Sequence, residues 1–432
     1  MNKENDIEVL NFENEKKSHM VIYKLIPILL IPFLFVLTII SLHSTKLIIK
    51  PLNYIIMVLL FSLILIYVVG LFKYKKKKKK KKLLKVVIPI LITIYILGCT
   101  CFTGLLYGPY KNFREWLIST SMATMNHQYL CEWFYSNKEI KKVLKNNYVI
   151  EVDETTDTDL IDVDKEIHYK NEYEKQILDH QKDEEYKIID LTVNGCNGHL
   201  VAIYDPSMVK VAVTRGLGSY GQYVTTMASN NNALVAVNGG GFFDPGNSST
   251  GGWPTGITIA NNKIVTDNNY SSYTQNGGLI GFNNDNVLVL MKTTTAREAI
   301  NNGIRDAVSW GPFLIVNGKP SFIKGNGGWG YAARTAIGQR EDGIVLLVVI
   351  DSNSTRTRGA DMVDLTEIMQ NYGAVNAANL DGGTSSVLVL PAAESLKYIP
   401  SCAKDYCYIN DPVDSTLTHK TRGIATSIIV TK

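Results

Sequence analysis

The sequence predicts an α+β domain, built around a large mixed sheet rich in antiparallel strands with few helices, preceded by three transmembrane helices. From residue 191 onward, short apolar runs are separated by turns rich in Gly and Asn, which is typical of strands. Helical patterns in that region are few and do not alternate regularly with the strands. The first quarter of the 432-residue chain instead contains three apolar segments.

The apolar segments cover about residues 20–42, 52–72 and 86–107. At about 20 residues, each is long enough to cross the hydrocarbon layer of a membrane as a helix. The first contains Lys24, and the other two carry no charge. A signal peptide is the alternative for the first segment, but three successive apolar segments favour retained membrane anchors.

A run of lysines from Lys75 to Lys82 lies in the loop 73–85, between the second and third apolar segments. The positive-inside rule places this loop and residues 1–19 in the cytoplasm, and everything after about residue 108 outside. We therefore expect a multi-pass protein of the cell membrane with an extracytoplasmic C-terminal domain. The loop is expected to contact anionic membrane lipid and not nucleic acid, because it is held between two membrane segments.

Residues 108–190 are predicted to form an extracytoplasmic stalk and acidic linker. Residues 113–118 and 139–145 have helical patterns, whereas residues 151–190 are rich in Asp and Glu and poor in apolar residues. That composition is typical of a solvated spacer. The acidic residues lack the spacing and central glycine of an EF-hand, so no calcium site is expected there.

The C-terminal region, residues 191–432, is long enough to form one hydrophobic core. Strands are expected at residues 199–204, 209–214, 233–237, 287–290, 344–350, 374–380, 387–390 and 424–430. The run 344–350 is apolar throughout, so it is expected to be a central strand buried on both faces. Helices are expected at residues 223–229, 295–301 and 362–372.

A polar, glycine-rich turn follows the strand that ends near residue 380. It reads Asn379-Leu-Asp-Gly-Gly-Thr-Ser-Ser386. Its glycines allow a ligand to approach the backbone, and its carboxylate and hydroxyl groups supply charge and hydrogen-bond donors. The alternative is a tight β-turn in which Asp381 only accepts hydrogen bonds from its own backbone.

Five other segments carry similar polar turns in the same region. They are Ala236–Phe243, Ser309–Pro312, Ala333–Gly338, Asp351 with Thr357–Gly359, and Thr421–Ala425. Together with the Asp381 turn, over roughly residues 190–432, they resemble the phosphodiester glycosidase family, which includes the lysosomal uncovering enzyme and many bacterial proteins. One departure is Gly423 after Arg422, where relatives often carry proline.

Few groups in this region suit histidine or metal chemistry. Of the seven histidines only His199 and His419 fall in it, and neither lies in a motif, which disfavours a Ser-His-Asp triad and a zinc site. Six cysteines form neither a disulfide framework nor a metal-ligand pattern, although Cys402 and Cys407 could close a short loop outside the cell. No metal site or cofactor is predicted, and the role of a divalent cation is left open.

The remaining carboxylates, asparagines and arginines suit a glycosyl phosphodiester, whose phosphate leaving group departs as a stabilised anion. We expect Asp381, Asp351 and Asn238 to be catalytic, with a turn hydrogen bond as the alternative for Asp351. Arginines would hold the phosphate through their planar fork of donors. The expected substrate-binding residues are Arg334, Arg358 (or its neighbour Arg356), Arg422, Gly239, Gly240, Phe242, Trp310, Thr335, Gly382, Gly383, Ser385 and Ser386.

The sequence and the resemblance therefore predict a membrane-anchored, extracytoplasmic hydrolase that cleaves sugar-1-phosphate diesters in cell-envelope or exopolysaccharide glycans. Two other functions stay open. One is a glycan-binding module without turnover, and the other is an accessory protein of polysaccharide export.

Overall fold

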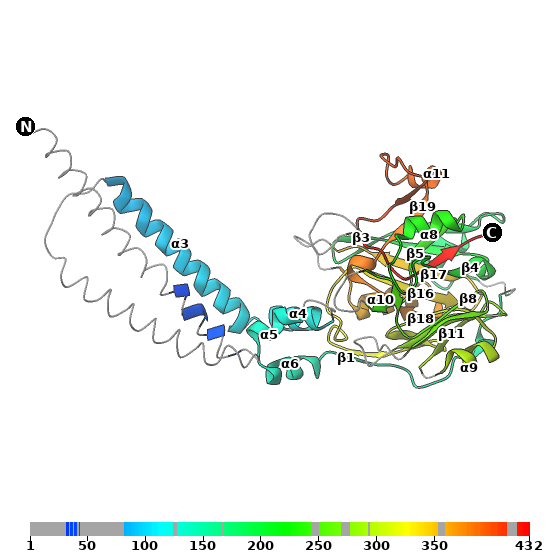
Figure 1. The fold of residues 1–432 in the computed structure, drawn as a ribbon, viewed down its shortest axis with the longest axis horizontal. Helices are drawn as coiled ribbons and strands as arrows, with labels where there is room; N and C mark the ends of the chain where they lie inside the picture. Colours follow the sequence, from blue (N-terminus) through cyan, green and yellow to red (C-terminus); the bar gives the residue numbers. More distant parts are fainter. Residues whose placement is uncertain are drawn as a thin grey trace, which may run out of the picture. The chain divides into compact units, whose positions relative to one another are not determined.

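The computed structural model describes residues 32–33, 35–37, 39–40, 43, 82–123, 128–163, 165, 168–243, 250–268, 277–292, 294–352, 359–412 and 421–432 (Figure 1). Contacts divide the chain into a first unit of residues 1–122 and 127–144 and a second unit of residues 123–126 and 145–432.

The first unit is helical. Its named helices are α3 (Lys82–Tyr107), α4 (Lys111–Met122), α5 (Tyr129–Phe134) and α6 (Asn137–Leu144). The predicted third apolar segment, residues 86–107, lies within α3 and is therefore helical, as expected. Among the helices of the described residues, however, none has the length and apolar character needed to cross a membrane. The predicted segment 52–72, most of the segment 20–42 and residues 73–81 of the lysine loop lie outside the described residues.

The described part of the second unit contains three main sheets, in place of the single large sheet predicted. All strand pairs between its named strands are antiparallel. The seven-stranded sheet has the order β14 (Lys319–Pro320), β13 (Phe313–Val316), β18 (Ala374–Asn379), β16 (Arg334–Arg340), β17 (Val345–Ile350), β3 (Cys196–Ile203) and β2 (Tyr186–Val193).

The other sheets are smaller. One five-stranded sheet has the order β11 (Leu288–Met291), β10 (Gly278–Asn283), β12 (Ile304–Trp310), β8 (Ile257–Ala260) and β9 (Lys263–Asp267). The second has the order β20 (Tyr406–Tyr408), β19 (Leu388–Pro391), β5 (Val235–Asn238), β21 (Thr426–Val430) and β4 (Val209–Val213). Two-stranded ribbons pair β1 (Tyr148–Ile150) with β15 (Phe322–Lys324), and β6 (Phe242–Phe243) with β7 (Trp253–Pro254).

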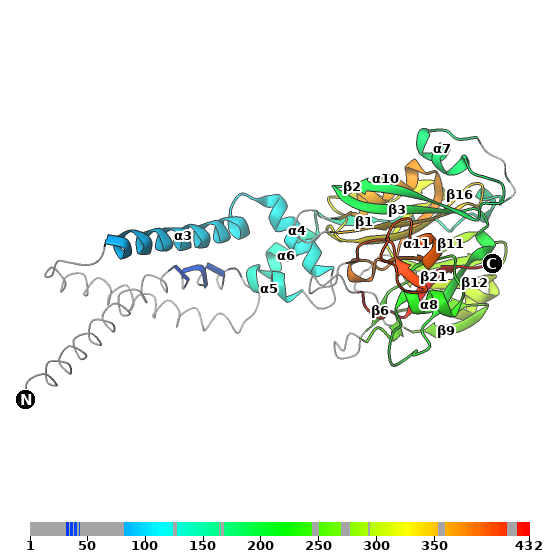
Figure 2. The same ribbon diagram turned by 90° about the horizontal axis from the view of Figure 1, so that it is seen from above.

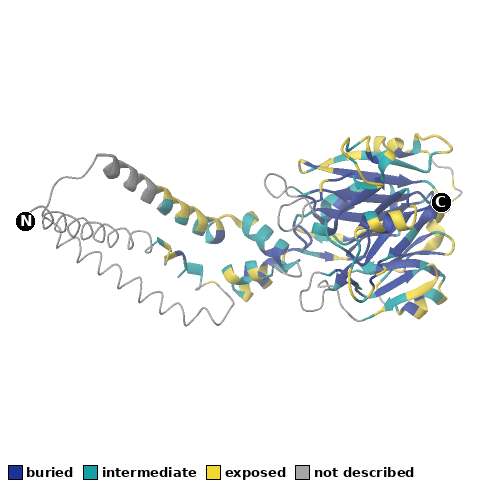
Figure 3. Ribbon diagram, turned by 45° about the horizontal axis from the view of Figure 1, so that its top comes forward, coloured by how far each residue is buried: buried dark blue, intermediate teal, exposed yellow. Residues whose placement is uncertain are grey.

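One hydrophobic core joins the three sheets. Leu347 of β17, Val237 of β5 and Ile280 of β10 belong to the same cluster of buried side chains, and the buried residues follow the strands in Figure 3. Every residue of β17 is buried, which confirms the prediction of a central strand over residues 344–350. Burial of long apolar runs from three sheets is the main stabilising contribution.

Helices in the second unit are few and short, as predicted. They are α7 (Glu172–Leu178), α8 (Val224–Asn230), α9 (Ala296–Asn301), α10 (Met362–Asn371) and α11 (Ala392–Ser395). The start of α10 is fixed by Asp361, whose carboxylate accepts hydrogen bonds from the backbone N–H groups of Val363 and Asp364. The helices predicted at residues 223–229, 295–301 and 362–372 are confirmed.

Residues 145–190, hereafter the strap, belong to the second unit and are not a solvated spacer. The strap begins with β1, which pairs with β15. It continues into β2, which forms the edge of the seven-stranded sheet by pairing with β3 (Figure 2). Between them, the hydroxyl of Thr156 donates to the backbone carbonyl of Leu290 and accepts from its N–H. The globular domain therefore begins near residue 145, earlier than the predicted boundary at residue 191.

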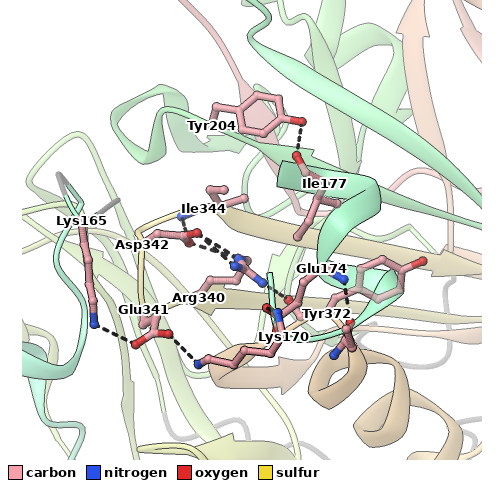
Figure 4. Close-up of polar contacts among 11 residues, drawn as sticks. Lys165, Lys170, Glu174, Ile177, Tyr204, Arg340, Glu341, Asp342, Ile344 and Tyr372 are labelled. Carbon is pink, nitrogen blue, oxygen red and sulfur yellow. Dashed lines mark hydrogen bonds and ion pairs between the residues drawn. The ribbon is translucent and has the colours of Figure 1, made fainter. Parts of the chain in front are cut away.

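Paired charges explain why the polar strap is ordered. The carboxylate of Glu341 accepts hydrogen bonds from Lys165 and Lys170 of the strap, at 2.9 and 2.8 Å (Figure 4). These bonds lower the pKa of Glu341 to about 2. Beside it Arg340, only 1% exposed, pairs with Asp342. The polar composition of the strap suggested a solvated spacer, because composition does not show that its charged side chains pair with residues elsewhere in the chain.

Candidate active site

Several predicted site residues lie at one edge of the seven-stranded sheet. Arg334 begins β16 opposite Ile350, the last residue of β17, and Ala336 lies opposite Asn379, the last residue of β18. The start of β16 and the ends of β17 and β18 therefore share an edge. In the neighbouring sheet, Asn238 ends β5 opposite Ser427 of β21.

Asn238 links the two sheets beneath the Asp381 turn. Its side chain is fully buried, and its Nδ2 donates to the backbone carbonyl of Asp381 at 2.6 Å. Its Oδ1 accepts from the hydroxyl of Thr335 at 2.7 Å and from the N–H of Val387 at 3.2 Å. Asn238, predicted to be catalytic, and Thr335, predicted to bind substrate, hold the backbone of the turn from its buried side. One N–H of the amide and both lone pairs of its oxygen are therefore used within the protein.

Gly239 and Gly240, predicted to bind substrate, are closely packed in the structure. A Cβ on Gly239 would lie 2.5 Å from Thr426 Oγ1, and one on Gly240 would lie 2.7 Å from the backbone oxygen of Ser309. The N–H of Gly239 donates to the carbonyl of Thr426, and that of Gly240 to its hydroxyl. These glycines let strands of two sheets approach closely.

The Asp381 turn rests directly on Arg334. Gly383 has φ of +63°, a conformation that favours glycine, and its N–H donates to the carbonyl of Ala333 at 2.8 Å. Gly382 is extended, but a Cβ there would lie 3.1 Å from the Ala333 oxygen and 3.4 Å from Arg334 Nη1. The two adjacent positions therefore require glycine for different reasons. Gly383 has a left-handed backbone, and Gly382 is in close contact with Ala333 and Arg334.

The carboxylate of Asp381 lies in an environment that shifts its titration. Burial raises the pKa of Asp381 to about 6, and the hydrogen bond from Ser385, the charge of Arg422, the N–H of Gly382 and the charge of Arg334 oppose that rise. Its Oδ1 accepts from the N–H of Gly382 at 3.0 Å. The Asp381 carboxyl is thus mostly ionised at neutral pH, although its pKa lies close to neutral pH.

Arg334 is held by the backbone and has little freedom to grip a ligand. The side chain is 4% exposed, and its Nε donates to the carbonyl of Ala360 at 3.1 Å. Its Nη2 donates to the carbonyls of Trp329 and Gly330, both at 2.7 Å. Burial lowers the pKa of Arg334 to about 10 against the opposing charges of Asp361, Asp381 and Asp364. The predicted bidentate contact with phosphate is not available through Nε and Nη2.

Arg422 is placed differently. Its guanidinium lies over the ring of Phe242, 4.5 Å from the ring centroid, which brings together two residues predicted to bind substrate. Its charge also acts on Asp381. Arg356 and Arg358 lie outside the described residues, so their contacts with substrate stay a prediction.

Asp351 follows β17 at the same edge, but its carboxylate is used to hold a loop. One oxygen accepts from Asn410 Nδ2 at 2.8 Å and the other from the N–H of Asp411 at 3.0 Å. Asn410 also donates to the carbonyl of Ser386 at 3.2 Å. Burial raises the pKa of Asp351. These are the contacts expected from the turn alternative. Across the described ranges, His, Cys, Asp and Glu side chains form no group of three or more that could hold a metal ion.

Several buried polar atoms that lack a hydrogen-bond partner among the described residues belong to segments of this site. They include the indole N–H of Trp310, Oδ1 of Asn379 and the hydroxyls of Ser386 and Thr255. A Cβ on Gly241 would overlap the Trp310 ring and lie 2.8 Å from the Thr255 hydroxyl, so both side chains border the same glycine. Unpartnered polar atoms are costly, and a polar ligand or water would satisfy them. Asn379 and Thr255 were not predicted as site residues; Asn379 could have been, since it opens the Asp381 turn.

Comparison with known families shows what this region is similar to. Residues 231–431 match the family model of phosphodiester glycosidases. The chain is similar to this family over slightly less than half of its length. The resemblance predicted from the polar turns is confirmed. The strap and the strands β2, β3 and β4 precede the matched residues, although they belong to the same compact unit.

Among individual relatives, the SPbeta prophage-derived uncharacterized protein YomE of Bacillus subtilis (strain 168) is 26% identical over 222 residues, which are 48% of this chain and 33% of that protein. The N-acetylglucosamine-1-phosphodiester alpha-N-acetylglucosaminidase of Mus musculus is 34% identical over 79 residues, 18% of this chain and 14% of that protein. The chain thus aligns with a third or less of either relative.

Among solved structures, the zebrafish N-acetylglucosamine-1-phosphodiester alpha-N-acetylglucosaminidase catalytic domain, auto-inhibited by its pro-peptide, is 22% identical with a TM-score of 0.43. That match covers 59% of this chain and 85% of the zebrafish chain. A putative exported protein from Burkholderia pseudomallei K96243 is 16% identical with a TM-score of 0.38, over 55% of this chain and 74% of that chain.

Proposed function

We propose that this chain is a membrane-anchored, extracytoplasmic hydrolase that cleaves sugar-1-phosphate diesters in cell-envelope or exopolysaccharide glycans. One observation carries the proposal. The Asp381 carboxylate, with its pKa raised to about 6, lies on a glycine turn where the charges of Arg422 and Arg334 both act on it. The match to the phosphodiester glycosidase family supports hydrolysis as the reaction.

The arrangement suits cleavage at an anomeric carbon. As the bond to the phosphate oxygen breaks, positive charge develops on the sugar, and the ionised carboxylate of Asp381 stabilises it. The leaving group is a phosphate monoester, a stable anion that needs little protonation. Arg422, oriented by the Phe242 ring, neutralises that phosphate. Arg334 contributes a fixed positive charge beneath the turn and holds its backbone.

The extracytoplasmic location is part of the proposal. The apolar segments and the lysine loop support membrane anchoring with the domain outside. A disulfide joins Cys402, in the loop between α11 and β20, to Cys407 of β20, and such bonds persist in oxidising compartments.

The test uses the full-length chain in detergent and the methyl phosphodiester of N-acetylglucosamine 1-phosphate, a small substrate that contains the sugar-1-phosphate diester linkage. We expect release of free sugar and methyl phosphate, and loss of that release in Asp381→Asn. Binding of the diester by both proteins without any sugar release would overturn the hydrolase and favour a glycan-binding module. Binding and sugar release must both be measured, because Asn238 and Asp351 make mostly structural hydrogen bonds and such bonds would also suit a binding module.

A further inference from the structure

Glu151 is a buried carboxylate of the strap that the proposed reaction does not use. It directly follows β1 and is 9% exposed. Its Oε1 accepts a hydrogen bond from the backbone N–H of Phe313 at 2.7 Å, and the N–H of Gly277 also donates to the carboxylate. Burying a charged group is costly unless it is hydrogen-bonded, so these two bonds fix where the side chain lies.

The two N–H groups belong to the ends of strands in different sheets. Gly277 directly precedes β10, whose first residue, Gly278, lies opposite Trp310 at the end of β12. Phe313 begins β13 after the Gly311-Pro312 dipeptide. Glu151 therefore ties together the two backbone segments on either side of Trp310.

The opposite side of this segment is held by the Asp381 turn. Asn379 Nδ2 donates to the carbonyl of Gly311 at 2.8 Å, and the N–H of Asn379 donates to the carbonyl of Pro312 at 3.0 Å. Residues 310–313 are thus clamped between Glu151 and Asn379. The indole N–H of Trp310 and Oδ1 of Asn379 are the two groups of this clamp that lack a partner among the described residues.

We propose that Glu151 is a positioning residue of the site, which acts by holding Trp310 and Asn379 where they meet the substrate. The inference rests on the proposed function. It also assigns part of the site to the strap, outside the residues 231–431 that match the family.

Glu151→Gln tests this role in the full-length chain. Gln offers a single acceptor oxygen, and its NH₂ group faces the second N–H, so one of the two bonds is lost. With the methyl phosphodiester, we expect KM to rise about tenfold with kcat within about threefold, because Trp310 and Asn379 bind substrate without taking part in bond cleavage. Glu154→Gln is the matched control. Glu154 lies in the same strap but pairs with Lys319 at the surface, so its KM should stay at the wild-type value.

A double-mutant cycle separates positioning from a general loss of structure. If Glu151 acts through Trp310, then in a Trp310→Phe background Glu151→Gln should change KM by less than about twofold. Full additivity of the two effects would overturn the proposal. So would a Glu151→Gln protein that unfolds at lower urea but has a wild-type KM in its folded fraction.

A readout without turnover keeps this inference distinct from the proposed function. The fluorescence of Trp310 is obtained for each protein by subtracting the spectrum of the same protein with Trp310→Phe. This difference spectrum should shift to longer wavelength in Glu151→Gln and remain unchanged in Glu154→Gln. If the wild type releases no sugar, the hydrolase proposal fails, and this shift still decides whether Glu151 positions Trp310. An unchanged Trp310 spectrum in Glu151→Gln would overturn the positioning role whether or not the protein is an enzyme.

Discussion

At the scale of single residues, two arginines near one carboxylate have different environments. Arg334 is buried and donates to three backbone carbonyls, whereas Arg422 stacks on an aromatic ring. Both charges act on Asp381. The same residue type therefore serves mainly structure in one case and phosphate recognition, by our proposal, in the other.

Lysine substitutions should separate these two roles. Arg334→Lys keeps the charge but cannot replace three hydrogen bonds, so we expect a loss of about 2–4 kcal/mol in the free energy of unfolding. Arg422→Lys should unfold within about 1 kcal/mol of wild type, because a lysine also lies favourably over an aromatic ring. Its kcat/KM should nevertheless fall about tenfold or more, because the planar fork is lost. Urea unfolding and steady-state kinetics measure both, and the reverse pattern would contradict the assignment.

The raised pKa of Asp381 predicts how activity depends on pH. If the ionised carboxylate stabilises the sugar cation, kcat/KM should fall below pH 6 to about a tenth of its plateau at pH 5. Loss of activity above pH 6 instead would mean that Asp381 acts as an acid. Stability has the opposite trend: since the folded pKa exceeds the unfolded value of about 3.9, this group's contribution declines as pH rises from about 4 to about 6 and is constant above. Asp381→Asn, which should be inactive, should lack this pH dependence of the free energy of unfolding.

At the scale of elements, local signals allowed prediction of many strands but not of the strap. Val345–Ile350 was predicted because a wholly apolar run is unambiguous. The strand Tyr186–Val193 was missed because an acidic composition is also typical of a spacer, although Asn194-Gly195 directly after it is a strong hairpin signal. Asn194 and Gly195 have φ of 51° and 77°, the left-handed conformation that such a turn requires.

The sequence predicted which residues lie at the candidate site better than it predicted what each of them does. The turn carrying Asp381 was found from its own residues, because glycines beside a carboxylate are a local pattern. That Asn238 faces inward could not be found this way, since its partners Thr335 and Val387 lie about 100 to 150 positions away and depend on the pairing of two sheets. The hydrogen bonds of Arg334 depend on tertiary contacts in the same way.

The strap should be required for the domain to fold. Removing it deletes Tyr186 to Asp190, five of the eight β2 residues that pair with β3, and leaves most of β3 as an open edge. We expect a fragment of residues 145–432 to unfold cooperatively in urea, and a fragment of residues 191–432 to aggregate or show no cooperative transition. Circular dichroism and size-exclusion chromatography compare the two. Equal stability of both fragments would mean that the strap is an accessory layer.

At the scale of the whole molecule, the predicted topology can be tested on intact cells. Protease added outside should release fragments of residues 145–432 and leave the lysine loop protected, because the loop is expected in the cytoplasm. Cys402 and Cys407 should be recovered as a disulfide after alkylation of free thiols, in a peptide 2 Da lighter than its reduced form. A domain cut only after the membrane is broken, with both thiols alkylated, would place it inside the cell.

The course of the strap also determines how the domain bears tension. A pull on residue 144 enters the domain at β1, whose short ribbon with β15 has only three residue pairs and should open first. The load then reaches Glu151 and Thr156, which are bonded to different sheets, before it arrives at β2. There it meets the eight residue pairs that join β2 to β3. A force that pulls on residue 144 would therefore displace Glu151, and with it the segment around Trp310, before it separates β2 from the seven-stranded sheet.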